Sequence, residues 1–281
     1  MDLSKSMSDA DFARLQSIVY DQTGISIGDS RRSMLVTRLR PRLRDLGLDD
    51  YKAYIARVAQ DPAERQELTN RVTTNETYFY RTPRVWTYFN EVFVPNFTEK
   101  VRGRAMRVWS AAASTGEEAH TIGVCLEDVR QRTEGFDYTI LGTDISSRVL
   151  EVATNGEYKG RPVARFQQTR PDLFEAHMVG SDDDGWKVAP KIKARIRFRQ
   201  HNLLKALANT APFDAIFLRN VLIYFKQADQ ERILAHVRTL LQPEGVLFIG
   251  ESETLKHVKA DFEQIEPIIY APSRRVGGPV A

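Results

Sequence analysis

The segment AASTG, Ala112 to Gly116, places small side chains between an apolar run and two glutamates. Two chemistries begin from such a strand-to-helix turn. Its spacing matches the nucleophile elbow G-x-S-x-G, with alanine at the first glycine, which would make Ser114 a hydrolase nucleophile. Small residues also let a backbone approach a nucleoside-bearing cofactor. A turn that needs small residues only for packing is the third interpretation, and this segment alone does not separate the three.

The place of this turn in the chain disfavours the hydrolase. An elbow serine follows several earlier strands, whereas helical patterns precede this one. The first loop of an S-adenosylmethionine-dependent methyltransferase does follow the first strand of its sheet. Asp144 ends the next apolar run, where an acid can accept hydrogen bonds from both ribose hydroxyls, although an N-cap role is its alternative. A dinucleotide-dependent oxidoreductase would use Asp144 similarly, but the sequence lacks its G-x-G-x-x-G.

Arg219 and Asn220 end a further apolar run, FDAIFLRN. Polar groups emerging from such a run cost stability if they are buried without partners, so we expect a bonding partner there. Amino-group methyltransferases acting on nucleic acids carry an acid or amide, two prolines and an aromatic at this place. Here VLIY follows Asn220 without prolines, which disfavours a nucleic-acid substrate.

These turns require a sheet that brings them together. Short apolar runs alternate with helical patterns, and the runs are MRVWSAA, YTILGTD, ARIRFRQ, DAIFLRN and GVLFIGES. Such alternation predicts an α/β domain with a doubly wound parallel sheet, in which ligands bind beyond the carboxyl ends of the strands. A turn at 182–185 predicts a small antiparallel β insertion at about 157–195.

The first hundred residues have the periodicity of short helices. Each predicted helix begins at a capping residue, and these residues are Ser8, Ser30, Asp49 or Asp50, Asp61 and Thr82. We therefore predict a helical domain at 1–80, a linking helix at 81–105 and the sheet domain at 106–281.

The composition, 42% hydrophobic and 27% charged over 281 residues, is that of a globular protein. No apolar run approaches the ~20 residues that span a bilayer, so we expect a cytoplasmic protein without membrane insertion. The lone Cys125 fits a buried hydrophobe. The histidines have no Cys or acidic neighbours at ligand spacing, so we predict no metal site.

Positive charge gathers in two places. Residues 31–44 hold six arginines and no acid, which favours an acidic partner. On a helix, Arg31, Arg38 and Arg42 share one edge of the apolar stripe, and we expect them to dock that partner. A solvated face is the alternative, because exposed ion pairs contribute only ~0 to 1 kcal/mol each. The second place is a predicted basic strand face with Lys191, Lys193, Arg195, Arg197 and Arg199.

Together the motifs resemble the CheR family of chemotaxis receptor methyltransferases from about residue 10 to 271. They occur in the family's order and are TTNETYFYR, RVWSAAASTGEEAHTI, LGTDIS, RQHNLL and FDAIFLRNVLIYF. The resemblance implies a Rossmann-like class I methyltransferase sheet with an N-terminal receptor-docking domain. It also implies a protein-glutamate O-methyltransferase, which converts glutamates on cytoplasmic chemoreceptor helices to γ-methyl esters and leaves S-adenosylhomocysteine, for chemotaxis adaptation.

The same resemblance implies roles for individual residues. Arg81 and Tyr224 are implied to be catalytic, with Tyr224 facing the transferred group, although a core tyrosine is its alternative. Glu117 is implied to meet the methionine end of the cofactor, with Glu118 as its competitor, and Asp144 to bind the ribose. The remaining implied cofactor neighbours are Asn75 and Thr77 above it, Asn202 and Leu203 beside the adenine, and Asn220 and Val221 near the methyl group.

The chemistry implied agrees with the absence of a metal motif. A carboxylate acceptor is already ionised at neutral pH, so methyl transfer to it needs no general base. In some relatives the β insertion binds a receptor C-terminal peptide by strand addition, and cations there serve that or protect an edge strand. We expect a monomer that binds no nucleic acid. The alternatives are a methyltransferase of another protein or nucleic-acid acceptor, and a catalytically silent binding module.

Overall fold

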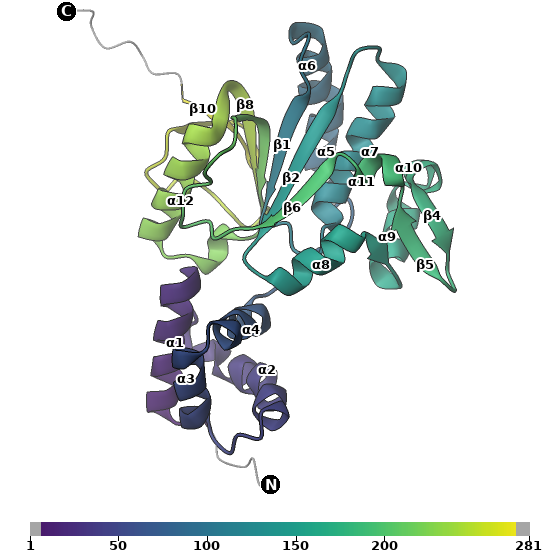
Figure 1. The fold of residues 1–281 in the computed structure, drawn as a ribbon. Coiled ribbons are helices and arrows are strands. Elements are labelled where there is room, and N and C mark those ends of the chain that lie inside the picture. Colours follow the sequence, from purple (N-terminus) through teal and green to yellow (C-terminus); the bar gives the residue numbers. More distant parts are fainter. Residues whose placement is uncertain (1–6, 274–281) are drawn as a thin grey trace, which may run out of the picture.

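The computed structural model describes residues 7–273, and its first part is a small helical domain with its own core. The elements of this domain are α1 (Asp9–Thr23), the 3-10 turn η1 (Asp29–Arg31), α2 (Arg32–Asp45), α3 (Tyr51–Gln60) and α4 (Pro62–Val72). Their apolar stripes converge on buried side chains such as Leu15, Leu39 and Tyr54. Figure 1 shows this domain beneath one end of the main sheet.

Capping chemistry explains most of the helix starts. The side chains of Ser8, Asp50 and Asp61 each accept a backbone N–H in the first turn of α1, α3 and α4, as predicted. The prediction for Ser30 is wrong, because a 3-10 turn that contains it precedes α2. Thr82 and Pro83 stand at the N-cap and first position of α5 as predicted, but the backbone of Thr82 is left-handed (φ 65°) and its side chain accepts no N–H.

The helical segment after this domain packs into the core of the sheet. It runs through α5 (Pro83–Tyr88), the π-helical turn η2 (Phe89–Phe93) and α6 (Val94–Lys100). The ring of Trp86 stacks on Phe217 with centroids 5.6 Å apart, and Phe89 meets the same ring edge-on at 5.4 Å. Aromatic burial therefore ties this segment to the sheet.

The main sheet has seven strands in the order β6-β2-β1-β7-β8-β10-β9. They are β1 (Met106–Ala111), β2 (Tyr138–Asp144), β6 (Ile196–Gln200), β7 (Phe213–Leu218), β8 (Leu241–Ile249), β9 (Phe262–Glu266) and β10 (Ile269–Pro272). All neighbours are parallel except β10, which is antiparallel to β8 and β9. Helices α7 (Glu117–Arg132) and α8 (Ser147–Asn155) lie on one side of the sheet and α12 (Gln227–Leu240) on the other (Figure 1). This is the predicted doubly wound, Rossmann-like sheet.

The strand register brings three chain segments to one edge. Ala111, the last residue of β1, pairs with Thr143 of β2 and with Leu218 of β7. The strand order reverses between β1 and β7, since β2 and β6 lie on one side of β1 and β7 and β8 on the other. The residues that follow these strands therefore meet at the switch point of the sheet, where ligands bind in this class of fold.

The inserted segment forms a second, three-stranded antiparallel sheet. Its elements are β3 (Glu157–Tyr158), α9 (Arg161–Thr169), α10 (Pro171–His177), β4 (Met178–Ser181) and β5 (Gly185–Val188), with strand order β3-β5-β4. The predicted turn between β4 and β5 is confirmed. This inserted sheet lies beside α7 and away from α12 (Figure 1).

The predicted basic strand face is wrong. Lys191 and Lys193 belong to the short helix α11 (Pro190–Lys193), which Pro190 starts at its first position. Only Arg197 and Arg199 lie on a strand, and that strand is β6 at the edge of the main sheet. An alternating pattern of cations and apolar residues thus spans a helix, a turn and an edge strand.

Hydrogen bonds from side chains and backbone attach the helical domain to the carboxyl edge of the main sheet. The hydroxyl of Tyr20 donates to Asp229 at 2.7 Å, and Gln66 Nε2 donates to the carbonyl of Ile145 at 3.1 Å. The backbone N–H of Ser26 donates to the carbonyl of Tyr224 at 2.9 Å. None of the helices in residues 7–273 has the length and apolar character needed to cross a bilayer.

Candidate functional site

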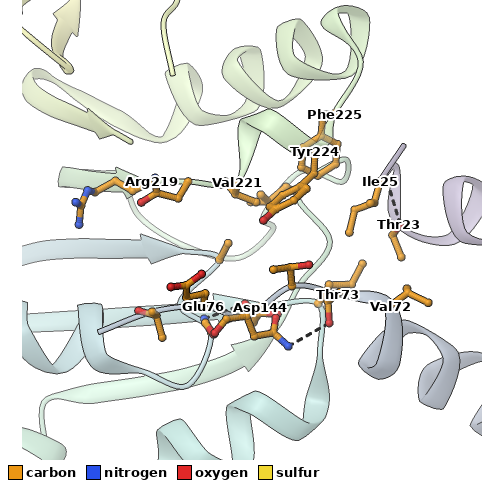
Figure 2. A pocket seen from close by; sticks show the side chains of 18 of the residues that line it. Thr23, Ile25, Val72, Thr73, Glu76, Asp144, Arg219, Val221, Tyr224 and Phe225 are labelled. Carbon is orange, nitrogen blue, oxygen red and sulfur yellow. Dashed lines mark hydrogen bonds between the residues drawn. The ribbon is translucent and has the colours of Figure 1, made fainter. Parts of the chain in front are cut away.

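A cavity lies beyond the carboxyl ends of β1, β2 and β7, between the sheet and the helical domain. Figure 2 shows Val221 and Tyr224 on the opposite side of it from Glu76 and Asp144. The helical domain supplies apolar lining on a third side, including Ile25. The cavity therefore combines buried charge with apolar walls, which is typical of small-molecule sites.

The loop between β1 and α7, residues 112–116, forms one wall and is called here the cofactor loop. Its residues Ala112 and Ser114 have left-handed backbone (φ 66° and 51°) and both line the cavity. Gly116 is left-handed as well (φ 96°), and a Cβ there would lie 2.8 Å from the Cβ of Ala153. Small residues are thus needed where the loop turns into α7.

Ser114 serves this loop as a structural link. Its Oγ donates a hydrogen bond to the carbonyl of Asn75 at 2.9 Å, and its backbone N–H donates to Asp144 Oδ2 at 2.9 Å. A hydrolase serine would instead give its proton to a general base. The bonding of Ser114 therefore speaks against the nucleophile-elbow interpretation.

Asp144 is a buried carboxylate at the end of β2, with 7% of its surface exposed. Its two oxygens accept the backbone N–H groups of Ser114 and Ser146, each at 2.9 Å. Burial raises the pKa of Asp144, and these backbone donors oppose the rise. Ser146 is the N-cap of α8, so Asp144 does not have the capping role that was its alternative. Each oxygen keeps a lone pair that can accept a further hydrogen bond.

The two glutamates that begin α7 have different surroundings. Glu118 lines the cavity, where its Oε2 accepts from Arg219 Nη1 at 2.9 Å and its Oε1 accepts from the Ser110 hydroxyl at 2.8 Å. Glu117 does not line the cavity and accepts from the hydroxyl of Thr115 at 2.6 Å. Burial raises the pKa of Glu117. Of the two glutamates, Glu118 is therefore the one that faces the cavity, because successive helix positions point about 100° apart.

Arg219 joins three elements at the cavity. Its side chain is 1% exposed, pairs with Glu118 and donates through Nη2 to the carbonyl of Arg81 at 2.8 Å. Its guanidinium also lies 5.9 Å from the ring centroid of Trp86. Arg219 therefore has the bonding partners that were expected for a polar residue at the end of β7.

The segment from Asn75 to Arg81 lies over the cavity. Asn75, Thr77 and Arg81 all line it. Arg81 Nη1 donates to the carbonyl of Glu76 at 3.0 Å, and its guanidinium lies 5.6 Å from the ring centroid of Tyr78. These contacts hold the arginine along its own segment.

The turn after β7 is held by an acid that the sequence analysis missed. Asn220 is left-handed (φ 58°) and lines the cavity with Val221. The carboxylate of Glu253 accepts the backbone N–H groups of Asn220 at 2.9 Å, Leu222 at 2.8 Å and Gly250 at 2.6 Å. Burial raises the pKa of Glu253, and these donors oppose the rise. In the sequence, the position of Glu253 shortly after the last apolar run of the sheet was the feature that could have indicated this role.

Asn202 and Leu203 line the cavity after β6. Asn202 Nδ2 donates to the carbonyl of Gln22 at 2.9 Å, and its Oδ1 accepts the N–H of Leu204 at 2.9 Å. The neighbouring His201 also lines the cavity, and burial lowers its pKa to about 4. This side of the cavity is therefore neutral, with an apolar side chain beside it.

Tyr224 lies in the 3-10 turn η3 (Leu222–Tyr224) and lines the cavity. The guanidinium of Arg31, from the helical domain, lies 5.2 Å from its ring centroid. Of the three arginines expected to dock a partner, Arg31 alone lines the cavity. Arg38 donates to the carbonyls of Val72 and Thr73 at the end of α4.

Arg42 has an internal partner that its neighbouring sequence does not reveal. Its Nε and Nη2 donate to the carboxylate of Glu64 at 3.0 and 2.6 Å, and the Glu64 side chain is 2% exposed. The structure thus gives Arg31, Arg38 and Arg42 three different environments. The docking role of the three remains a prediction.

The residues of this cavity fit the cofactor that the sequence implied. A buried carboxylate with free lone pairs suits a ribose, Glu118 suits an ammonium group, and the neutral Asn202 and Leu203 suit an adenine ring. Within residues 7–273, no group of three or more His, Cys, Asp or Glu side chains is placed to hold a metal ion.

Comparisons with known proteins cover nearly the whole chain. A family model described as CheR methyltransferase, SAM binding domain, matches residues 75–270, and one described as CheR methyltransferase, all-alpha domain, matches residues 10–73. The chemotaxis protein methyltransferases of Salmonella typhimurium and Escherichia coli are 36% and 35% identical over 273 residues, each covering 95% of this chain and 92% of the relative. Among solved structures, a glycopeptide N-methyltransferase complexed with sinefungin aligns to 63% of this chain and 52% of its own, with 13% identity and a TM-score of 0.36.

Proposed function

This chain belongs to the CheR methyltransferase family, and we propose that it transfers a methyl group from S-adenosylmethionine to glutamate side chains of chemoreceptors. The products are glutamate γ-methyl esters and S-adenosylhomocysteine, and the process served is chemotaxis adaptation. One observation carries the proposal: the carboxylates of Asp144 and Glu118 line a single cavity at the switch point of the sheet, closed on its other side by the helical domain.

When bound, S-adenosylmethionine supplies an electrophilic methyl group on a positively charged sulfur. We assign the ribose hydroxyls to Asp144, whose oxygens are oriented by two backbone donors. Glu118 is assigned to the ammonium of the methionine end, and Arg219 holds that carboxylate in place. Asn202 and Leu203 are assigned to the adenine, and Asn220 and Val221 to the surroundings of the methyl group.

The acceptor needs alignment more than activation. Its carboxylate is ionised at neutral pH and can attack without a general base. Arg31 and Arg81 bring positive charge to the cavity, which supports their attraction of the acceptor carboxylate. Tyr224 lies beside Arg31, and its hydroxyl is a suitable donor to one carboxylate oxygen. Holding the reacting atoms in this way contributes roughly 7 to 11 kcal/mol to the lowering of a barrier.

The walls of the cavity favour the reaction by excluding water. Ile25, Val221 and Phe225 are apolar and lie around Tyr224 (Figure 2). Methyl transfer cancels the negative charge of the acceptor and the positive charge of the donor. An apolar wall therefore disfavours the charged reactants relative to the less charged transition state.

The receptor has two candidate contact surfaces. One is the helical domain, whose Arg31 lines the cavity. The other is strand β4 of the inserted sheet, which within residues 7–273 pairs with β5 alone and exposes 59% of Val179. An open edge of this kind supports the addition of a receptor C-terminal peptide as a further strand.

The experiment that tests the proposal uses the full chain with radiolabelled S-adenosylmethionine and membranes rich in chemoreceptors. We expect methyl groups on the receptor that base treatment releases, because esters hydrolyse in base. Label that resists base would assign the acceptor to an amine or a nucleic acid. Failure to bind S-adenosylhomocysteine in calorimetry would identify a silent binding module instead. Reaction of Ser114 with a fluorophosphonate probe would restore the hydrolase.

A further inference from the structure

Tyr158 reaches from the inserted sheet to the cofactor loop. It is the second residue of β3, pairs with Trp186 of β5 and is 5% exposed. Its hydroxyl donates a hydrogen bond to the carbonyl of Thr115 at 2.7 Å. Thr115 follows Ser114, whose backbone N–H holds Asp144. A single side chain thus connects the inserted sheet to the loop whose backbone holds the carboxylate of Asp144.

The hydroxyl of Tyr158 also contacts His120. Its Nδ1 lies 2.7 Å from the Tyr158 hydroxyl. The single proton of that hydroxyl is used at Thr115, so Nδ1 carries a proton and donates it to the hydroxyl oxygen. Burial lowers the pKa of His120 to about 3, which keeps the ring neutral, and its Nε2 has no hydrogen-bond partner in residues 7–273. The chain of donors therefore runs one way, from His120 through Tyr158 to Thr115.

The Tyr158 side chain is closely packed on the side of its ring and at its hydroxyl. The ring of Phe79 meets the Tyr158 ring edge-on, with centroids 5.0 Å apart and planes at 83°. A Cβ at Gly116 would lie 3.0 Å from the Tyr158 hydroxyl, so the loop passes directly against it. The loop itself needs such restraint, because Ala112 and Ser114 both hold a left-handed backbone that is disfavoured for residues with a side chain.

We propose that Tyr158 is a positioning residue for the cofactor, which fixes the cofactor loop at Thr115 and is itself oriented by His120. The inserted sheet is then part of the cofactor site and not only a surface for the receptor. This inference rests on the proposed function, since it assumes that the cavity binds S-adenosylmethionine.

The test is the substitution Tyr158→Phe, which removes one hydroxyl and leaves the ring. The carbonyl of Thr115 then loses its buried donor, and the loop is free to shift. We expect the Kd for S-adenosylhomocysteine in calorimetry to rise roughly tenfold, as the loss of one such bond predicts. In receptor methylation the KM for S-adenosylmethionine is expected to rise, while the KM for the receptor stays unchanged.

Tyr138→Phe is the matched control. Tyr138 is fully buried, and the single proton of its hydroxyl is shared between the carbonyl of Gly123 and Glu127 Oε2, each at 3.2 Å, further along α7 from the loop. Both variants are expected to have a lower melting temperature than the wild type. Only Tyr158→Phe is expected to weaken the binding of S-adenosylhomocysteine. An equal loss of affinity in both variants would reduce the effect to general destabilisation and overturn the proposal.

Two substitutions test the role of His120. Asparagine places an N–H close to the position of Nδ1, whereas leucine offers no donor. We expect His120→Asn to keep the wild-type Kd for S-adenosylhomocysteine and His120→Leu to raise it. Equal Kd values in these two variants would contradict the orienting role. If the wild-type protein itself does not bind S-adenosylhomocysteine, the proposed function fails; if it binds and Tyr158→Phe binds equally well, only this inference fails.

Discussion

Glu118 Oε2 lies 2.9 Å from Nη1 of Arg219, and this ion pair joins the start of α7 to the residue that follows β7. Glu117, one position earlier, has no part in it. We expect Glu118→Gln to raise the Kd for S-adenosylhomocysteine at least tenfold, because a charge-assisted contact to the ammonium is lost. Glu117→Gln is the control and is expected to leave the Kd unchanged. Calorimetry with both variants checks the assignment, and the reverse order of effects would return it to Glu117.

Asp144→Asn tests the ribose carboxylate. An amide offers one acceptor oxygen in place of two, so we expect a loss of S-adenosylhomocysteine affinity of roughly tenfold or more. Asp214→Asn is a matched control at the opposite end of the sheet, where the carboxylate accepts from Arg104 at 2.8 and 2.7 Å. That variant is expected to lower the melting temperature without changing the Kd. A normal Kd for Asp144→Asn would remove the ribose assignment.

Arg31→Glu tests the residue just before α2 that reaches the cavity. The substitution places a negative charge beside Tyr224, so we expect a higher KM for the receptor through repulsion of the acidic acceptor. Arg44→Glu changes the same charge at an exposed position of α2 outside the cavity lining and serves as the control. Steady-state methylation over a range of receptor concentrations separates the two. Equal KM values for both variants would mean that position 31 has no special role.

The ion pair of Arg42 with Glu64 is expected to stabilise the helical domain. Removing one partner leaves a carboxylate that is 2% exposed without its cation, so we expect Arg42→Ala to lower the free energy of unfolding by about 3 kcal/mol. Arg57→Ala breaks the more exposed pair with Asp61 and is expected to cost less than about 1 kcal/mol. Urea unfolding measures both. A small effect of Arg42→Ala would free this arginine for a docking role.

The buried ring of His120 is expected to make the protein sensitive to acid. Its pKa is depressed to about 3 in the folded state, from an ordinary value near 6.5, by burial and by the charge of Lys193. Below pH 6.5 the His120 ring binds a proton in the unfolded chain but stays neutral in the folded chain. The free energy of unfolding therefore decreases as the pH falls below 6.5. At pH 5 this loss amounts to about 2 kcal/mol.

Urea unfolding of the wild type and of His120→Asn at pH 7 and pH 5 measures this contribution. The wild type is expected to lose more stability between the two values than the variant. Asp144, Glu117 and Glu253 have raised pKa values and act in the opposite direction, but they are common to both proteins. Parallel pH dependence in the two proteins would show that His120 is not the cause.

The positions of the strand ends could be predicted from the sequence because they follow from topology. Parallel strands at a switch point bring the residues after β1, β2 and β7 to one edge, whatever their side chains do. Asp144, Asn220 and the cofactor loop therefore came together as expected. The choice between Glu117 and Glu118 could not be predicted, since it depends on the rotation at which the left-handed Gly116 starts α7.

Partners distant in the chain were also invisible to sequence patterns. Arg42 faces an acid twenty-two positions away, and the turn of Asn220 is held by Glu253, thirty-three positions away. The alternation of cations and apolar residues at 191–199 predicted a single strand. That prediction is wrong because Pro190 starts a short helix there. Local sequence patterns thus predict the positions of helices and strands. Contacts between residues distant in the sequence decide which charged side chains remain free to bind a ligand or partner.

The cavity is bounded by two bodies that each have a separate hydrophobic core, one in the helical domain and one around the sheet. A ligand with contacts on both bodies binds only while both are folded and adjacent. Ligand binding then stabilises the state in which the two bodies are in contact. The free energy of this stabilisation is RT ln(1 + [L]/Kd), so it increases with the ligand concentration. A ligand that contacts both the helical domain and the sheet is therefore expected to raise the melting temperature of the whole chain as its concentration increases.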